Sequence, residues 1–331
     1  MRAEELADNI RTLLPKQRTI CIEGSPGGGK TSIVRQVAEQ EGVGYIELHM
    51  PTMLVEDFGI LYPNGDDMLS YKLPYWWPSA DRTDIPDVGI LCFDDRNQAN
   101  ADLQKVLANI CQARTLHGSK MKGGWQVVST GNRVEDRAGA NRILSHLSGR
   151  ETVIPLETQL DDWCRWALQS HVNQELMSFI RFRPNLLQDF DPQRRSNPTP
   201  RSWVEGVGEL MGVVPKHSEY EIFKGAVGEG AAAEFVGFLK IYRELPDPDK
   251  VLRDPDSVEV PSDPSTKYAL SGALSERVDT KTFANMIKFF DRFDGAEFGV
   301  LAVSYALRKT PEISSTEAFS KWAVDKQDML F

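Results

Sequence analysis

Residues 23–33, EGSPGGGKTSI, place four glycines and a proline directly before a lysine and a threonine. Gly24, Gly29, Lys30 and Thr31 fit the phosphate-binding pattern of a glycine, four further residues, Gly-Lys and Ser or Thr. Glycine suits such a loop because side chains would keep phosphate oxygens away from backbone N–H groups, and because glycine can adopt positive φ. The residues that we expect to bind a nucleotide are Gly24, Ser25, Pro26, Gly27, Gly28, Gly29, Lys30, Thr31 and Ser32.

Lys30 and Thr31 carry side chains that can act on a bound triphosphate. The lysine supplies a positive charge to the β- and γ-phosphates, and the threonine hydroxyl is a ligand for Mg²⁺. The helix that begins near Thr31 directs its N-terminal dipole at the same anion. The alternative is a flexible turn that matches the pattern by chance. It does not account for the apolar run before the loop and the helical pattern after it.

Two acids end the apolar run GILCFDD of residues 89–95. A nucleotide-hydrolysing site needs an anchor for its metal ion and a group that orients water. Asp94 suits the metal role, through water or together with Thr31. Asp95, just past the run, suits the base that polarises the attacking water. The alternative interpretation of this pair is a simple acidic turn.

Short apolar runs alternate with helical patterns in the first half of the chain. The predicted strands are residues 19–24, 44–50, 89–95, 125–132 and 151–157, and the predicted helices are residues 30–40 and 102–113. This alternation predicts an α/β fold, a parallel five-stranded sheet with helices on both faces. Ligands of such sheets bind beyond the carboxyl ends of the strands. The glycine loop, the acid pair and the TGN of residues 130–132 all lie at those ends, so one composite site is expected.

From about residue 158 onward the patterns are helical. Helices are predicted over residues 161–182, 202–214, 231–245, 282–293 and 297–309, and a loop over the Pro- and Asp-rich residues 246–265. We therefore predict four parts. They are an α/β nucleotide-binding domain at residues 1–157, a helical lid at 158–245, a linker at 246–265 and a helical C-terminal region at 266–331.

The composition is typical of a globular protein with a sizeable core. Of 331 residues, 41% are hydrophobic and 26% are charged, and the formal net charge is -10. This acidic balance disfavours nucleic-acid binding through charge alone, because phosphate contacts need clustered Lys and Arg. No apolar run approaches the roughly 20 residues of a membrane span, and the start does not resemble a signal peptide. We expect a cytoplasmic protein whose four cysteines are reduced thiols.

In this order, the motifs resemble those of the MoxR-type AAA+ ATPases, over roughly residues 18–215. GSPGGGKT resembles the Walker A segment of that family, FDDRNQA its Walker B segment and STGN its sensor 1. The resemblance implies that Asn132 lies beside the γ-phosphate and the attacking water. Asp95 stands where the family has Glu, so its carboxylate is one methylene closer to the backbone.

Three further segments extend the resemblance. HLSGRETVIPL resembles the segment that carries the arginine finger, which implies that role for Arg150, with Arg142 as the alternative. TPRSW resembles sensor 2 and implies that Arg201 lies near the γ-phosphate. Residues 60–73 fall where the family carries an inserted hairpin, and their Asn-Gly pair suits its turn.

The resemblance implies a stand-alone ATPase of the kind found in bacterial and phage genomes. Its ligands are ATP and Mg²⁺. Its partners are further copies of the chain, in a hexameric ring, and a protein client that it remodels, of the kind bearing a metal-dependent adhesion domain. Two alternatives stay open, a nucleic-acid motor such as a helicase or packaging ATPase, and a slow nucleotide-dependent scaffold. The sequence does not distinguish ATP from GTP.

Overall fold

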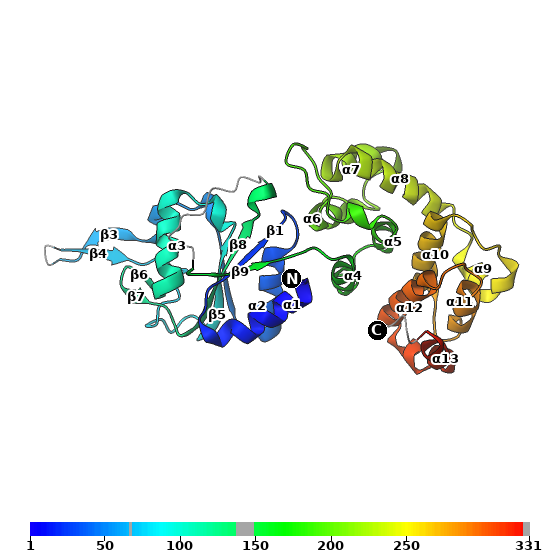
Figure 1. Cartoon of the computed structure of the whole chain (residues 1–331), viewed down its shortest axis with the longest axis horizontal. Coiled ribbons are helices and arrows are strands. Elements are labelled where there is room, and N and C mark those ends of the chain that lie inside the picture. The colour runs from blue at the N-terminus through cyan, green and yellow to red at the C-terminus, as the bar shows by residue number, and fades with distance from the viewer. Residues whose placement is uncertain (66–67, 137–148, 327–331) are drawn as a thin grey trace. The chain divides into compact units, whose positions relative to one another are not determined.

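A five-stranded parallel sheet forms the centre of the first half of the chain (Figure 1). Its strands are β1 (Ile20–Gly24), β2 (Gly44–His49), β5 (Val88–Asp94), β8 (Gly124–Asn132) and β9 (Thr152–Pro155), in the order β2-β5-β8-β1-β9. The computed structural model describes residues 1–65, 68–136 and 149–326. The chain divides into two compact units, residues 1–159 with 190–193, and residues 160–189 with those from 194 onward.

Helices cover both faces of the sheet. α1 (Ala3–Leu13) and α2 (Lys30–Glu41) pack on one face, and α3 (Ala101–Ala113) packs on the other (Figure 1). Alternate side chains of β5 belong to opposite cores, since Ile90 packs with α1 and α2 whereas Leu91 packs with α3. A central strand buried on both sides has to be apolar throughout, which explains its continuous apolar run. This arrangement confirms the predicted fold class.

Two strands within residues 60–73 pair antiparallel, as the predicted hairpin requires. Its strands are β3 (Ile60–Pro63) and β4 (Leu69–Lys72), and a smaller hairpin consists of β6 (Thr115–Leu116) and β7 (Ser119–Lys120). The larger hairpin extends away from the sheet (Figure 1). The ring of His117, in the turn of the smaller hairpin, stacks on Tyr71 with the ring centroids 3.6 Å apart. The two hairpins therefore support each other.

In the part of the second unit that the structure describes, the regular secondary structure is helical. Its helices are α4 (Leu160–Gln169), α5 (Gln174–Phe182), α6 (Pro200–Val204), α7 (Glu219–Val227), α8 (Glu229–Arg243), α9 (Pro248–Arg253), α10 (Pro264–Arg277), α11 (Phe283–Phe290), α12 (Glu297–Lys309) and α13 (Glu317–Asp325). They enclose two apolar cores, and α10 contributes Ala269 to the first and Leu270 to the second. None of the helices among the described residues is both long enough and apolar enough to cross a membrane.

Two predicted helices are broken or shorter than their patterns suggest. Residues 161–182 form α4 and α5, because the backbone turns at His171, whose φ of 56° is left-handed. Residues 202–214 are α-helical only up to Val204, at the end of α6. The glycines at 206, 208 and 212 explain the early end, since each glycine lowers helix stability by about 1 kcal/mol relative to alanine.

The Pro- and Asp-rich segment 246–265 is not a loop along its whole length, because it contains α9. The side chain of Asp247 caps this helix by accepting a hydrogen bond from the backbone N–H of Asp249. Val251 and Leu252 are buried against the second unit's C-terminal core. Burial of these two side chains stabilises α9. The polar composition of the segment did not indicate this contact. The four-part domain division stays a prediction.

All four cysteines are free and buried. Burial raises the pKa of the Cys21 thiol to about 12 and that of Cys164 to about 11. It also raises the pKa of Cys92 and of Cys111. Because the thiolate is the reactive form, these buried thiols are unreactive, in agreement with the expectation of reduced thiols. The sulfur of Cys21 also accepts hydrogen bonds from Nε and Nη2 of Arg96, at 3.0 and 2.7 Å.

Candidate nucleotide site

The glycine loop connects the carboxyl end of β1 to the start of α2. Gly27 and Gly29 have φ values of 70° and 86°, in the left-handed region that favours glycine. A Cβ atom on Gly24 would lie 2.9 Å from the backbone oxygen of Leu156, so a side chain does not fit there either. The loop therefore presents bare backbone directly before the N-terminus of a helix, which is where anions bind.

Lys30 begins α2, and its side chain points back into the loop, where the residue is only 7% exposed. Its ammonium group donates hydrogen bonds to the backbone oxygens of Gly24 and Ser25, both at 3.0 Å. It also donates to Oδ1 of Asn132 at 2.9 Å. These contacts hold a positive charge between the loop and the end of β8, within the space that phosphates of a bound nucleotide would approach.

Asp94, the last residue of β5, is the centre of a second set of contacts. Its Oδ1 accepts hydrogen bonds from the hydroxyls of Thr31 and of Thr130, the latter at 2.7 Å, and its Oδ2 lies 3.2 Å from Nδ1 of His49. Burial alone would raise the pKa of Asp94. The hydrogen bonds from Thr31, Thr130 and His49 outweigh burial and hold the pKa below its ordinary value. Asp94 is therefore a carboxylate at neutral pH.

Asp95 adopts a left-handed backbone conformation, with φ 51° and ψ 42°. Aspartate is one of the few residues other than glycine that is enriched in this region, which gives a physical reason for Asp rather than Glu here. Its backbone N–H donates to Oγ1 of Thr130 at 3.0 Å, and its Oδ1 accepts from Nδ2 of Asn132 at 3.2 Å. Asn97 donates in turn to the backbone oxygen of Asn132 at 2.7 Å. The Asp95 carboxylate is thus held toward Asn132.

The carboxylates at this edge of the sheet fit a divalent cation. Ligand atoms of His49, Asp94 and Asp95 all lie within 4.8 Å of one another, and Thr31 contacts Asp94 directly. Mg²⁺ takes oxygen ligands, usually one or two carboxylates together with phosphate oxygens and water. The hydroxyl of Thr31 and the ionised Asp94 match that donor set, whereas the imidazole of His49 is a donor that transition metals prefer.

The fold brings together five of the side chains that the sequence singled out. Lys30 contacts Asn132, Asn132 contacts Asp95, and Thr31 contacts Asp94. The two acids are joined through Thr130, whose hydroxyl binds the Asp94 carboxylate and the Asp95 backbone. The connected set lies at the carboxyl ends of β1, β5 and β8, the edge where the sequence placed it.

Other predicted residues do not join this connected set among the described residues. Ser32 is exposed on α2, and Arg150 is half-buried in the turn that precedes β9. Arg201 is exposed on α6 and belongs to the second unit. Arg142, the alternative arginine finger, lies outside the described residues.

Three side chains of the site were given no role from the sequence. His49 pairs in register with Asp94 across β2 and β5, and Thr130 precedes Asn132 by two residues and so points to the same side of β8. Arg133 donates to Oγ of Ser25 and forms an ion pair with Asp136 at 2.9 Å. The alternation of side chains in a strand is the signal that could have indicated Thr130.

The strand order, the glycine loop between β1 and α2 and the acids at the end of β5 define the P-loop AAA+ fold, here followed by a helical C-terminal region. This assignment rests on the topology and on the position of the loop.

No protein-family model matches the sequence, and no curated protein matches it. Similar solved structures include NtrX from Brucella abortus in complex with ADP, at 14% identity over 99% of this chain and 68% of that chain, with a TM-score of 0.39. They also include the RuvB Holliday junction branch migration motor of Thermotoga maritima, at 13% identity over 82% of this chain and 80% of that chain, with a TM-score of 0.39. Hsp104 with ATPγS and FITC-casein matches at 13% identity over 51% of this chain, with a TM-score of 0.37, and the match spans 35% of the Hsp104 chain.

Proposed function

We propose that the chain is an ATP-hydrolysing AAA+ ring motor of the MoxR type that remodels or assembles a protein client. The observation that supports this most is the connected set of side chains at the carboxyl edge of the sheet. It joins a phosphate-binding lysine, a metal-binding pair and a water-orienting pair. The order of the GSPGGGKT, FDDRNQA and STGN motifs supports the MoxR type.

In this proposal the loop of residues 24–32 binds the phosphates through its backbone N–H groups. Lys30 exchanges the backbone oxygens of Gly24 and Ser25 for oxygens of the β- and γ-phosphates, while it keeps Asn132 within reach. Thr31 and Asp94 would hold Mg²⁺. Bound there, Mg²⁺ neutralises the negative charge of the β- and γ-phosphate oxygens.

Asp95 has the role of the base. Its carboxylate orients a water molecule whose oxygen attacks the γ-phosphorus, and it takes the proton as the bond to the bridging oxygen breaks and ADP leaves. Asn132 donates to Oδ1 of Asp95 and so fixes the direction of the carboxylate. The Asp side chain is one methylene shorter than Glu, which would place the base farther from the attacking water and slow hydrolysis. A slow, nucleotide-dependent scaffold is therefore the second candidate function.

Two arginines complete the proposal. The site of one subunit has its lysine, metal-binding groups and base within one chain, and an arginine supplied by a neighbour would add a cation at the γ-phosphate. We assign that role to Arg150, in the turn before β9, and the sensor 2 role to Arg201 on α6. Subunits would then assemble into a ring, which we expect to be hexameric.

The purified protein is expected to hydrolyse ATP and to assemble when ATP is added, because each site needs its neighbour's arginine. Phosphate release and light-scattering mass, measured on the same dilution series, test this expectation. The specific activity should fall when dilution dissociates the assembly. Constant specific activity in a monomer would contradict the ring. Repeating the series with GTP decides which nucleotide the site prefers.

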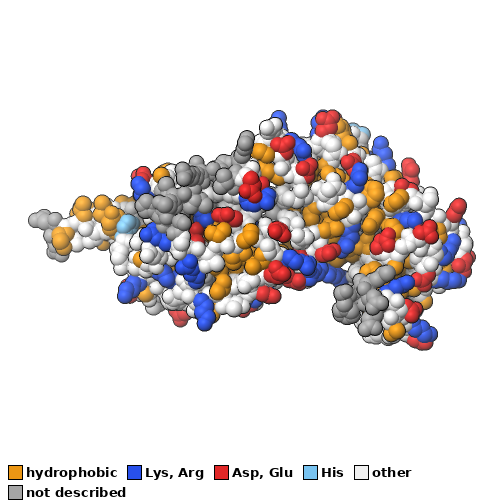
Figure 2. All heavy atoms as spheres, viewed as in Figure 1, with side chains coloured by type: hydrophobic (Ala, Val, Ile, Leu, Met, Phe, Trp, Pro, Cys, Tyr) orange, Lys and Arg blue, Asp and Glu red, His pale blue; other side chains and the backbone are white. Residues whose placement is uncertain are grey.

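The hairpin of β3 and β4 is proposed as the contact for the protein client, such as one bearing a metal-dependent adhesion domain. Among the described residues, exposed large hydrophobic side chains concentrate between residues 54 and 75. They are Leu54, Val55, Ile60, Leu61, Tyr62, Met68, Leu69, Tyr71 and Tyr75. Figure 2 shows hydrophobic side chains over the hairpin, at the left of the view. A contiguous group of exposed hydrophobic side chains on a protein surface marks an interaction site.

Replacing both Leu61 and Leu69 by Ser is expected to abolish client binding and to leave ATP hydrolysis intact. The strand register places these two side chains on one face of the hairpin. Burial of one leucine at an interface contributes about 1.5–3 kcal/mol, so the loss is large. The test uses immobilised Asp95→Asn protein with ATP and compares the amount of client protein that it retains with and without the two serine substitutions. Val213→Ser, at an exposed hydrophobic position of the second unit, is the matched control. Equal retention by all variants would rule the hairpin out as the contact.

A further inference from the structure

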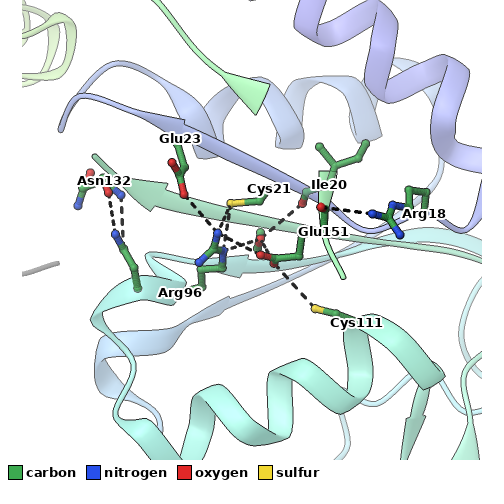
Figure 3. A network of polar contacts seen from close by, with 10 residues as sticks. Arg18, Ile20, Cys21, Glu23, Arg96, Cys111, Asn132 and Glu151 are labelled. Atoms are coloured by element: carbon green, nitrogen blue, oxygen red, sulfur yellow. Dashed lines mark hydrogen bonds and ion pairs between the residues drawn. The ribbon is translucent and has the colours of Figure 1, made fainter. Parts of the chain in front are cut away.

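A group of charged side chains is centred on Arg96, in which Arg96 and Glu151 are buried and Glu23 is partly exposed (Figure 3). The Arg96 side chain is 2% exposed and forms ion pairs with Glu151 at 3.0 Å and with Glu23 at 3.3 Å. The Glu151 side chain is 3% exposed and also accepts a hydrogen bond from Ser129 Oγ at 2.8 Å. We call these four residues the Arg96 cluster.

Stability alone does not account for the Arg96 cluster. Removing a charge from water costs several kcal/mol, and apolar residues of similar volume often replace a buried ion pair with no loss of stability. Nη1 of Arg96 is buried and has no hydrogen-bond partner among the described residues, so the guanidinium is not even fully satisfied. An arrangement this costly calls for a role beyond holding the core together.

The position of the cluster along the chain indicates that role. Arg96 directly follows Asp95, the proposed base, and Glu23 directly precedes the first glycine of the loop. Glu151 directly follows Arg150, the proposed arginine finger. Each charged member of the cluster is thus bonded through one peptide group to a residue or loop of the proposed site.

The Arg96–Glu151 ion pair is held in place both on the Glu151 side and on the Asp95 side. The Glu151 carboxylate is fixed by Arg96 and by Ser129, so a shift of the backbone at residue 150 has to displace an anchored group. Asp95, at the other end, is held in its left-handed conformation with its N–H bonded to Thr130. A displaced Arg96 therefore pulls on the backbone that orients the Asp95 carboxylate.

We propose that Arg96 and Glu151 are positioning residues that link the Arg150 turn to the base of the same subunit. When Arg150 engages the nucleotide of the neighbouring subunit, the ion pair fixes Asp95 in its working orientation. Hydrolysis in one subunit then depends on whether the next site is occupied. This inference rests on the proposed ring with Arg150 acting in trans, and it adds a specific pair of residues that carries the coupling.

The test uses mixtures with Lys30→Ala protein, which occupies ring positions but is expected to leave its own site without nucleotide while its Arg150 is intact. For the native cluster, hydrolysis per intact site is expected to fall as the fraction of Lys30→Ala subunits rises. The fall should reach at least about fivefold, the lower end of typical coupling between sites. In mixtures of Glu151→Gln protein with a Glu151→Gln/Lys30→Ala double variant, hydrolysis per intact site should stay constant.

The dependence of hydrolysis per intact site on the fraction of Lys30→Ala subunits, called the mixing curve, distinguishes a positioning role of Glu151 from a structural one. A structural role would lower hydrolysis by the same factor at every mixing ratio and leave the shape of the curve unchanged. Glu219→Gln is the matched control, because Glu219 is a buried carboxylate paired with Arg243, in the second unit. Its curve should match that of the native protein. If Glu151→Gln protein fails to fold, the Arg96→Met/Glu151→Leu variant, which removes both charges of the pair, carries the test.

Two results would overturn the inference while the proposed function stands. The native protein would hydrolyse ATP in mixed rings with the same rate per intact site at every ratio, or the Glu151→Gln curve would fall as steeply as the native one. Failure of the proposed function has a different signature. The native protein would then hydrolyse no ATP, or it would form no mixed assemblies with Lys30→Ala protein.

Discussion

Lys30→Ala is expected to abolish nucleotide binding, whereas Asp95→Asn is expected to keep binding and stop hydrolysis. The ammonium of Lys30 lies between the loop and Asn132, where it would face the β- and γ-phosphates. A hydrogen bond to a charged group contributes about 1.5–3 kcal/mol. Loss of two such contacts weakens binding by roughly 10² to 10⁴ fold.

Asp95→Asn changes the chemistry and leaves the shape of the side chain. The amide cannot take a proton from water, and general-base catalysis is worth about 10² to 10⁴ in rate. Thr31 and Asp94 are untouched, so the metal-binding groups stay in place. Asparagine also tolerates the left-handed backbone of this position, so the fold is not strained.

Fluorescent-nucleotide titration and phosphate release, measured on the same preparations, distinguish the two variants. Lys16→Ala is the control for loss of a lysine, because Lys16 is exposed and outside the site. If Asp95→Asn protein hydrolyses ATP at the native rate, Asp95 is not the group that activates water. If the native protein binds ATP tightly and neither protein releases phosphate above background, the scaffold function replaces that of the motor.

Arg150→Ala is expected to keep ATP binding and to lose most hydrolysis. An arginine supplied in trans to a phosphoryl-transfer site is worth about 10³ to 10⁵ in rate. The lysine, the metal-binding pair and the base all come from one chain, so binding does not depend on the neighbour. Arg35→Ala is the matched control, because Arg35 is a half-exposed arginine of α2.

Mixing Arg150→Ala with Lys30→Ala subunits is expected to restore part of the activity that both parents lack. At some interfaces an intact loop then meets an intact arginine. The subunit with the intact loop lacks its own Arg150, so the coupling inferred above limits the recovery to about one fifth or less per such site. Phosphate release at several mixing ratios measures the recovery, and labelled subunits show whether the rings contain both variants. A mixture as inactive as its parents, in rings that contain both, would count against Arg150 and favour Arg142.

The sequence by itself determined the parts of the site that lie in local patterns. A glycine loop between an apolar run and a helical pattern, and two acids at the end of another run, each occupy a few consecutive residues. Because parallel strands end at the same edge of a sheet, their order along the chain was enough to predict that Lys30, Asp94 and Asn132 meet. The hairpin at residues 60–73 was also local, since its turn and its strands are adjacent.

The helix α10 shows what the local pattern could not determine. Its sequence, PSTKYALSGALSER, has small and apolar residues on all sides, so no single apolar face marks it. It is stable because it is packed between two cores of the second unit. Gly272 fits closely against Ser178 of α5, where an added Cβ would lie 2.3 Å from the serine hydroxyl. That fit exists only after both helices are placed.

Only the tertiary structure decided where the charged side chains around the site lie. The motif FDDRNQA does not indicate that Arg96 is buried. Its partners Glu23 and Glu151 are far away in the sequence, and the positions of β1 and of the start of β9 bring them into contact with it. His49 contacts Asp94 for a similar reason, since the register of β2 and β5 aligns their last residues. Charged and polar side chains are compatible with water or with a partner. The choice between the two depends on long-range register and packing, which the residue types alone do not specify.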